Sequence, residues 1–253
     1  MDFTIEKYEN LCSALSQFFE IFPVNRYLIE KPQKNFLILR HDIDRKICNA
    51  LQMAKFEHTR GIQSTYYFRY PYTFKPDMIK KIQSLGHEIG YHYEVLSKSK
   101  GNFPEAIQLF ENELTEFKKI CDIQTICMHG SPLSKFNNLD LWKKYEYSRF
   151  GIIGEAFLSV KNIPYFSDTG RSWSGENNLR DHIDEKECIG ICHSTDDLIK
   201  KIQQNSFSKL YLNIHSERWA TSNRDWIYQQ CFDECVNIGK KVIRRVRNVT
   251  HHK

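Results

Sequence analysis

Apolar, strand-like runs alternate with helical patterns along most of this chain, and that alternation constrains the fold more than any other feature. Such alternation is typical of βαβ units and therefore of a largely parallel sheet. A length of 253 residues suits one (β/α) barrel. We therefore predict an α/β fold in which residues 1–253 form a single barrel domain, with residues 1–35 as an N-terminal helical extension.

Local patterns define the individual elements. Phe103–Cys121 is the strongest predicted helix, because its apolar residues recur at helical spacing. The other predicted helices are Thr4–Phe19, Lys46–His58, Pro76–Leu85, Leu139–Lys144, Thr195–Gln204 and Arg224–Lys240. Five predicted strands should be neighbours in one sheet: Phe36–Arg40, Ser64–Arg69, Glu88–Tyr91, Thr125–Met128 and Lys209–Ile214. Further short strands are predicted at Gly151–Ala156, Tyr165–Phe166 and Cys188–Ile191.

Chemically capable side chains follow the ends of these strands. The stretches concerned are His41–Asp44, His92–Glu94, His129–Ser131, Asp168–Arg171 and His215–Arg218. In a parallel barrel the carboxyl ends of the strands converge on one mouth. We therefore expect these five stretches to meet in one site.

Asp42 and Asp44 are one residue apart at a strand end, so their side chains point the same way if the strand continues. Two such close carboxylates favour a bound cation or one raised pKa. The alternative for Asp44 is the N-cap of the helix beginning near Lys46. His92 is a candidate nitrogen ligand for zinc or a similar metal, whereas His87 at the start of its strand is interpreted as structural.

The stretches LRHDID, GHEIGYH and LNIHSERW together resemble the motifs of the polysaccharide deacetylases, the NodB-homology group of carbohydrate esterases. The resemblance covers roughly residues 36–219 and implies a distorted (β/α) barrel with a divalent metal ion held by one Asp and two His. It also implies Asp42 as the general base, Asp44 as a metal ligand, His92 as the first histidine ligand and His215 as the general acid. An imidazole, whose pKa is near neutrality, suits that last role.

The sequence departs from the family pattern at two points. Asp42-Ile43-Asp44 replaces two adjacent aspartates, as in Asp-x-Asp variants of the family. Leu96 occupies the place of the second histidine, and leucine cannot bind a metal. The candidates for a third ligand are His129, Glu94 and His41, in that order; otherwise water fills the position or the site holds no metal.

Other residues are expected to contact the substrate or to support the catalytic groups. His129 is a site residue that binds either metal or substrate, and Glu94 is a second substrate-binding candidate. Asp168 and Arg171 resemble the charged pair that orients the catalytic base in the family, the alternative being a surface salt bridge. Trp173 and Trp219 could form flat walls for a sugar ring or belong to the core.

Charge and composition limit the partners. The formal net charge is +5, and the only dense basic run is Lys240, Lys241, Arg244, Arg245 and Arg247. No aromatic residues alternate with it, so we expect no nucleic-acid partner, although an anionic lipid or a nucleotide-linked sugar stays open. The N-terminal stretch does not resemble a secretory signal, and no apolar run is long enough to span a bilayer. We therefore expect a cytoplasmic protein with buried, reduced cysteines.

The predicted function is the metal-dependent hydrolysis of an amide on an N-acylated sugar, with zinc as the expected metal. The sugar follows from the family resemblance. The lack of an export signal favours an intracellular precursor, such as a nucleotide-linked or lipid-linked sugar in surface polysaccharide biosynthesis. One alternative is a sugar-binding barrel that has lost its metal chemistry. Another is a hydrolase of the same mechanism acting on a non-sugar amide or an ester.

Overall fold

The computed structural model describes residues 1–176 and 192–251, with side chains described up to residue 240. The strands are β1 (Glu20–Phe22), β2 (Phe36–Ile43), β3 (Thr65–Phe68), β4 (Glu88–Tyr93), β5 (Thr125–Met128), β6 (Gly154–Glu155), β7 (Tyr165–Ser167) and β8 (Lys209–Ile214). The α-helices are α1 (Ile5–Phe18), α2 (Val24–Glu30), α3 (Ile47–Thr59), α4 (Pro76–Ser84), α5 (Val95–Lys98), α6 (Phe103–Lys118), α7 (Thr195–Gln203) and α8 (Asn223–His251). Within the described residues, 3₁₀ helices lie at Asn138–Lys143, Tyr147–Phe150 and Ser216–Arg218.

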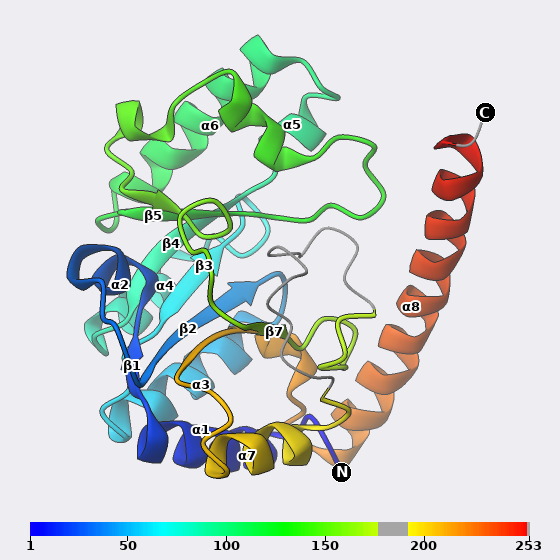
Figure 1. Cartoon of the computed structure of the whole chain (residues 1–253). Coiled ribbons are helices and arrows are strands. Elements are labelled where there is room, and N and C mark those ends of the chain that lie inside the picture. The colour runs from blue at the N-terminus through cyan, green and yellow to red at the C-terminus, as the bar shows by residue number, and fades with distance from the viewer. Residues whose placement is uncertain (177–191, 252–253) are drawn as a thin grey trace.

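All eight strands belong to one parallel sheet with the order β6-β5-β4-β3-β2-β8-β7. Strand β1 pairs with the first half of β2, before β3 begins its own pairing at Arg40. Among the described residues, the sheet is open between β6 and β7. Helices cover its outer side (Figure 1). The predicted distorted (β/α) barrel and the predicted neighbours among the five main strands are confirmed.

Strand β2 shows how side-chain alternation separates the interior of the barrel from its helical coat. Leu37 and Leu39 face the core beneath α1 and α7, where they pack with Leu11 and Leu198. Each fully buried leucine side chain contributes roughly 2 kcal/mol to stability. The intervening residues face the other way, and Arg40 donates hydrogen bonds to the Tyr211 and Tyr165 hydroxyls inside the barrel. The same alternation sends His41 outward and Asp42 inward.

Several predicted elements differ in extent or type. Strands β2 and β4 run past their predicted ends to Ile43 and Tyr93, so Asp42 and His92 are strand residues. The N-terminal extension is not purely helical, because it contributes β1. The segment predicted as a helix at Leu139–Lys144 is 3₁₀, and α8 continues beyond Lys240 to His251. The strand predicted at Cys188–Ile191 lies outside the described residues.

None of the helices in the described part of the chain is long and apolar enough to cross a membrane.

Candidate metal centre and active site

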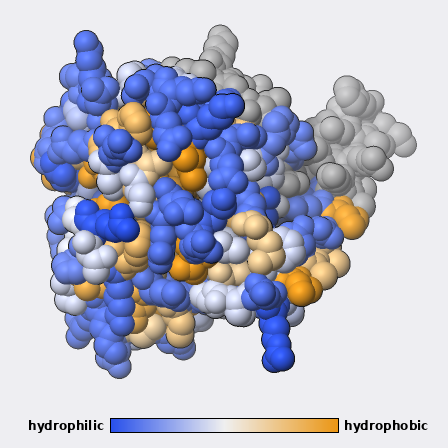
Figure 2. Space-filling model, turned by 90° about the horizontal axis from the view of Figure 1, so that it is seen from below, coloured by the Kyte–Doolittle hydropathy of each residue, from blue (hydrophilic) through white to orange (hydrophobic). Residues whose placement is uncertain are grey.

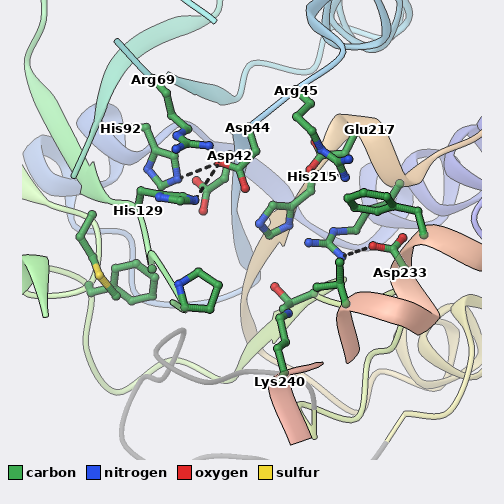
Figure 3. Close-up of a pocket in the computed structure, with 18 residues that line it drawn as sticks. Asp42, Asp44, Arg45, Arg69, His92, His129, His215, Glu217, Asp233 and Lys240 are labelled. Carbon is green, nitrogen blue, oxygen red and sulfur yellow. Dashed lines mark hydrogen bonds and ion pairs between the residues drawn. The ribbon is translucent and has the colours of Figure 1, made fainter. Parts of the chain in front are cut away.

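The carboxyl ends of β2, β4, β5 and β8 surround one cavity of about 330 Å³ (Figure 3). Five of the residues predicted for the site line it: Asp42, Asp44, His92, His129 and His215. They come from distant parts of the sequence, and the parallel order of the strands brings them together. The other predicted site residues, Glu94, Asp168, Arg171, Trp173 and Trp219, lie behind the cavity wall.

Asp44, His92 and His129 form a group suited to a metal ion. The Nε2 atoms of His92 and His129 lie 3.5 and 3.6 Å from the same Asp44 oxygen, Oδ1. Two ligand atoms on a tetrahedral ion with bonds of 2.0–2.2 Å are about 3.4 Å apart, so each histidine nitrogen lies at a ligand-like spacing from the Asp44 oxygen. Asp44 Oδ1 is buried and accepts no hydrogen bond within the described structure. A buried acceptor without a partner is costly, and a divalent cation would satisfy it.

His129 stands where the missing histidine would be needed. Leu96 is buried in the hydrophobic core, so its position on α5 faces away from the cavity. Strand β5 pairs with β4, and the His129 amide donates to the Tyr93 carbonyl at 2.7 Å, which places His129 beside His92. Strand β5 thus presents a second imidazole next to His92, in place of the histidine that the chain lacks at Leu96.

Glu94 supports His129 instead of facing the substrate, contrary to our expectation. Its carboxylate accepts a hydrogen bond from His129 Nδ1 at 2.9 Å and two from Arg69 at 2.8 and 2.9 Å. Donation through Nδ1 leaves Nε2 as the lone-pair nitrogen toward Asp44, the arrangement seen around ligating histidines. Burial opposes ionisation of Glu94, but His129 and Arg69 outweigh it and lower the pKa of this carboxyl to about 2.

His92 is held in the same way and is uncharged at neutral pH. Its Nδ1 lies 3.0 Å from the Cys127 carbonyl oxygen, to which it donates. Burial lowers the pKa of His92 to about 4, despite the opposing charges of Asp42 and Asp44. Burial also opposes ionisation of Asp44, but the charges of His129 and His92 hold the pKa of its carboxyl well below the usual range. A neutral imidazole and an ionised carboxylate are the forms that bind metal.

A second grouping of ligand atoms lies deeper in the barrel. Atoms of Asp42, His92 and Cys127 approach within 4.8 Å of one another. However, the Arg40 guanidinium donates to the Cys127 sulfur at 3.1 Å and lies 3.4 Å from Asp42 Oδ2. This fully buried positive charge repels a cation. Arg69 lies 3.8 Å from Asp44 Oδ1 but is partly exposed and paired with Glu94, so the group formed by Asp44, His92 and His129 is the better candidate.

Asp42 is fixed at one oxygen and open at the other. Its Oδ2 accepts a hydrogen bond from Asn213 Nδ2 at 2.9 Å and lies beside Arg40. Its Oδ1 is buried without a hydrogen-bond partner among the described residues, although Asp42 lines the cavity. The carboxylate therefore has a free acceptor for a proton or a polar ligand. Arg40 and Asn213, which sequence reasoning missed, share the inward face with Asp42 because Arg40 pairs with Asn213 across β2 and β8.

His215 and Asp168 form a pair on the other side of the cavity. His215 Nδ1 and Asp168 Oδ1 are 2.7 Å apart, and the His215 amide also donates to this carboxylate. Trp219 Nε1 donates to Asp168 Oδ2 at 2.8 Å. Burial and Arg218 favour the neutral imidazole, but Asp168 outweighs them and raises the pKa of His215 to about 9. His215 is therefore an imidazolium at neutral pH.

The predicted pairing of Asp168 with Arg171 as the group that orients Asp42 is wrong. Asp168 bonds to His215, whereas the Arg171 guanidinium lies over the Trp226 ring at 5.0 Å. The residue takes a left-handed backbone conformation with φ of 55°, just after Gly170, and this turns it toward α8. Arg40 and Asn213 hold Asp42 instead.

The two tryptophans proposed as sugar walls belong to the core. Trp173 and Trp219 are buried and pack around Phe3, so neither offers a face to the cavity. The aromatic side chains that line the cavity are Phe157 and Phe232. Local sequence gave no signal for them, because Phe157 follows β6 and Phe232 comes from the C-terminal helix.

Six further charged residues line the cavity: Arg45, Arg69, Glu217, Arg218, Asp233 and Lys240. Glu217 and Arg218 belong to the predicted stretch His215–Arg218, whereas sequence reasoning missed the other four. Burial and nearby Asp44 raise the pKa of Glu217 to about 7. Arg218 pairs with Asp233 at 3.4 Å, which joins the end of β8 to α8 (Figure 3). Asp233 and Lys240 could not be predicted because α8 reaches the cavity only through the tertiary fold.

No model of a known protein family matches the sequence, and no curated protein sequence does either. Among solved structures, the chain is similar to the peptidoglycan deacetylase PdaC from Bacillus subtilis, at 10% identity and a TM-score of 0.45, covering 85% of this chain and 94% of that one. It is also similar to the catalytic domain of a peptidoglycan N-acetylglucosamine deacetylase from Eubacterium rectale, at 13% identity and a TM-score of 0.45, covering 81% of this chain and 86% of that one. Another similar structure is a CE4 family pseudoenzyme from Bacillus anthracis, at 12% identity and a TM-score of 0.45, covering 82% of this chain and 63% of that one. Likenesses of this size are too slight to assign a function, which therefore has to come from the cavity itself.

Proposed function

We propose that the protein is a metal-dependent hydrolase that removes the acyl group from an N-acylated sugar. The observation that carries the proposal is the pair of imidazole nitrogens 3.5 and 3.6 Å from one unpartnered oxygen of Asp44. A second carboxylate with a free oxygen, Asp42, and a protonated histidine, His215, line the same cavity. This combination provides a metal centre, a base and an acid for cleaving an amide.

Asp44, His92 and His129 would hold the ion. A bound divalent ion would polarise the acyl carbonyl and make a water molecule easier to deprotonate. Asp42 is suited to take the proton from that water, because its Oδ1 is free while Asn213 holds Oδ2. The choice of metal follows from the ligand types: one carboxylate oxygen and two imidazole nitrogens favour zinc or a similar ion.

His215 is suited to protonate the departing nitrogen. Its raised pKa of about 9 keeps the imidazole protonated at neutral pH, and Asp168 fixes the ring through Nδ1. The opposite ring nitrogen, Nε2, is left to donate to a leaving group in the cavity. An amine is a poor leaving group unless it gains a proton, so this donor makes an amide a fitting substrate.

The sugar in this proposal rests on the resemblance of LRHDID, GHEIGYH and LNIHSERW to the deacetylase motifs. Phe157 and Phe232 line the cavity and supply apolar surface of the kind that packs on a sugar ring. A cavity of about 330 Å³ accommodates a small ligand. We extend the proposal to an N-acylated sugar in surface polysaccharide biosynthesis.

The test combines metal analysis with turnover. Protein purified without chelator should contain about one equivalent of divalent metal, as a single three-residue site allows. It should release free amine from a small N-acetylated amino sugar, and chelation should stop the release. A protein that binds the sugar but holds no metal and releases no amine would instead be a sugar-binding barrel.

A further inference from the structure

Helix α8 carries its apolar surface on the wrong side for a helix that packs on a barrel. Ile227, Tyr228 and Ile238 are 60, 63 and 64% exposed. Cys231 and Cys235, which we expected to be buried, are exposed as well. Spacings of three and four residues put these five side chains on one face of the helix. Apolar side chains gather at the right-hand side of the molecule in Figure 2, where Figure 1 places α8.

The opposite face of α8, which contacts the rest of the protein, is mainly polar. Asp233 pairs with Arg218, and Asn237 donates to the Gly170 carbonyl at 3.0 Å. Trp226 Nε1 donates to the Asp2 carbonyl at 2.7 Å. A surface helix normally buries its apolar stripe and exposes its polar one. Here the fold uses the polar face, and the apolar stripe is left without a partner in the described structure.

Positive charge is concentrated at the end of the same helix. The last sixteen residues of the sequence, of which all but the final two belong to α8, contain six of the 36 Lys and Arg residues and none of the 31 Asp and Glu residues. The rest of the chain, with 30 basic and 31 acidic residues, therefore has a net charge of −1. A basic segment that continues an exposed apolar stripe is typical of helices that lie on anionic membrane surfaces.

We propose that the outer face of α8 docks on an anionic lipid surface. The stripe would enter the interface, and the basic end of the helix would contact the lipid headgroups. A second copy of this chain fits less well. Two parallel α8 helices would bring their basic ends together. In an antiparallel pair each basic end would face the first half of the other helix, where Glu234 is the one exposed acidic residue among those described. Nucleic acid would explain the basic end but not the apolar stripe.

Docking by the outer face of α8 leaves the cavity uncovered, because the cavity is lined by other residues of the same helix. Phe232, Val236 and Lys240 of α8 line the cavity, whereas Ile227 and Ile238 do not. A membrane-bound molecule would thus have one wall of its cavity next to the lipid headgroups. The proposal does not depend on hydrolase activity, because the outer stripe contributes no residue to the candidate metal centre.

The test is co-sedimentation of the full chain with lipid vesicles. The protein should bind phosphatidylcholine vesicles containing about 30% phosphatidylglycerol, and binding should fall roughly tenfold without the anionic lipid or in about 0.5 M salt. Ile227→Glu combined with Ile238→Glu should also weaken binding roughly tenfold. The matched control is Ile29→Glu on α2, which is 68% exposed and should bind like the wild type.

The thermal midpoint and the metal content of the double variant should match the wild type, which separates a docking defect from misfolding or from a failed metal centre. Lys241→Gln with Arg245→Gln should reduce both the binding and its salt dependence.

Failure of the wild type to bind anionic vesicles, or unchanged binding of the variant with both Ile227→Glu and Ile238→Glu, would overturn the proposal. A dimer that the double variant converts to a monomer in light scattering would assign the stripe to a second copy. Binding of an oligonucleotide in preference to the vesicles would assign the basic end to nucleic acid.

Discussion

Two buried polar clusters share strand β2 and differ in how completely their atoms are paired. On the outer face, Glu57 accepts hydrogen bonds from the Tyr66 hydroxyl at 3.0 Å and the Ser64 hydroxyl at 2.5 Å, and also from Tyr8. His41 Nε2 lies 2.9 Å from the same carboxylate. At the barrel mouth, Asp44 Oδ1 has only Nε2 of His92 and of His129 at 3.5 and 3.6 Å and Arg69 at 3.8 Å, and it accepts no hydrogen bond among the described residues.

We interpret the first cluster as one that stabilises the protein and the second as one prepared for a ligand. Both Glu57 oxygens have close donors, so this carboxylate is satisfied without any further group. The cluster at the mouth has two carboxylate oxygens, one on Asp42 and one on Asp44, that lack donors although they are buried. The neighbouring residues His41 and Asp42 thus belong to different clusters, because strand alternation places their side chains on opposite faces of the sheet.

Of the variants considered, Asp42→Asn should have the largest effect, and this effect should be confined to turnover. The amide cannot take the proton of the attacking water, so amine release from an N-acetylated amino sugar should fall by about a thousandfold. Metal content and the thermal midpoint should stay near wild type, because Asp42 need not hold the ion. Full turnover by the variant would remove Asp42 as the base. Asp44→Ala and His92→Ala are the companion variants and should lose the metal itself.

Glu57→Gln should instead affect stability. Burial opposes ionisation of Glu57, but His41, His87 and Ser64 outweigh it and lower the pKa of the carboxyl to about 2. A depressed pKa contributes stability above the unfolded value, and this contribution is lost as the pH falls toward about 2. The variant should lose about 3 kcal/mol near pH 6, measured by urea unfolding, while turnover per folded molecule is kept.

The matched control for Glu57 is Glu88→Gln. Glu88 is also buried and bonded, to Thr125 at 2.5 Å and Thr65 at 2.6 Å, but burial raises the pKa of its carboxyl to about 7. Near pH 6 this side chain is largely protonated, so replacing it with the neutral amide should cost much less. Equal losses for the two variants would contradict the assignment of an ionised carboxylate to Glu57.

Glu94→Gln should weaken metal binding by about 10- to 100-fold, the usual effect of removing a carboxylate behind a ligating histidine. The reason is that Glu94 fixes His129 through Nδ1 and leaves Nε2 for the ion. Titration with zinc under competition from a chelator measures the affinity. Glu105→Gln on the exposed start of α6 is the control and should bind zinc like the wild type. Unchanged affinity of Glu94→Gln would contradict a ligand role for His129.

The smallest effect concerns pH. A general acid works only while protonated, so turnover should fall about tenfold per pH unit once the pH exceeds the His215 pKa of about 9. Asp168→Asn removes the charge that raises this pKa, and the decline should then begin at lower pH. Rates measured between pH 6 and 10 on both proteins test this, and an unmoved decline in the variant would exclude His215 as the acid.

Local patterns were sufficient for most of the fold. Thr125–Met128 and Lys209–Ile214 are strands as predicted, and the helix predicted at Thr4–Phe19 differs by one residue at each end. These elements depend on side-chain periodicity, which neighbours in the sequence set. The position of chemically capable residues at strand ends was also readable, because parallel strands bring their carboxyl ends to one side.

The sequence by itself determined the chemical types at the barrel mouth, while the tertiary structure decided which of them meet. His129 approaches Asp44 because β5 lies beside β4, and no spacing along the chain encodes that contact. The fold also turned Glu94 behind His129, paired Asp168 with His215 and placed Trp219 in the core. Each of these outcomes depends on packing between segments far apart in sequence, where burial and available partners select the contact that a polar or aromatic side chain makes.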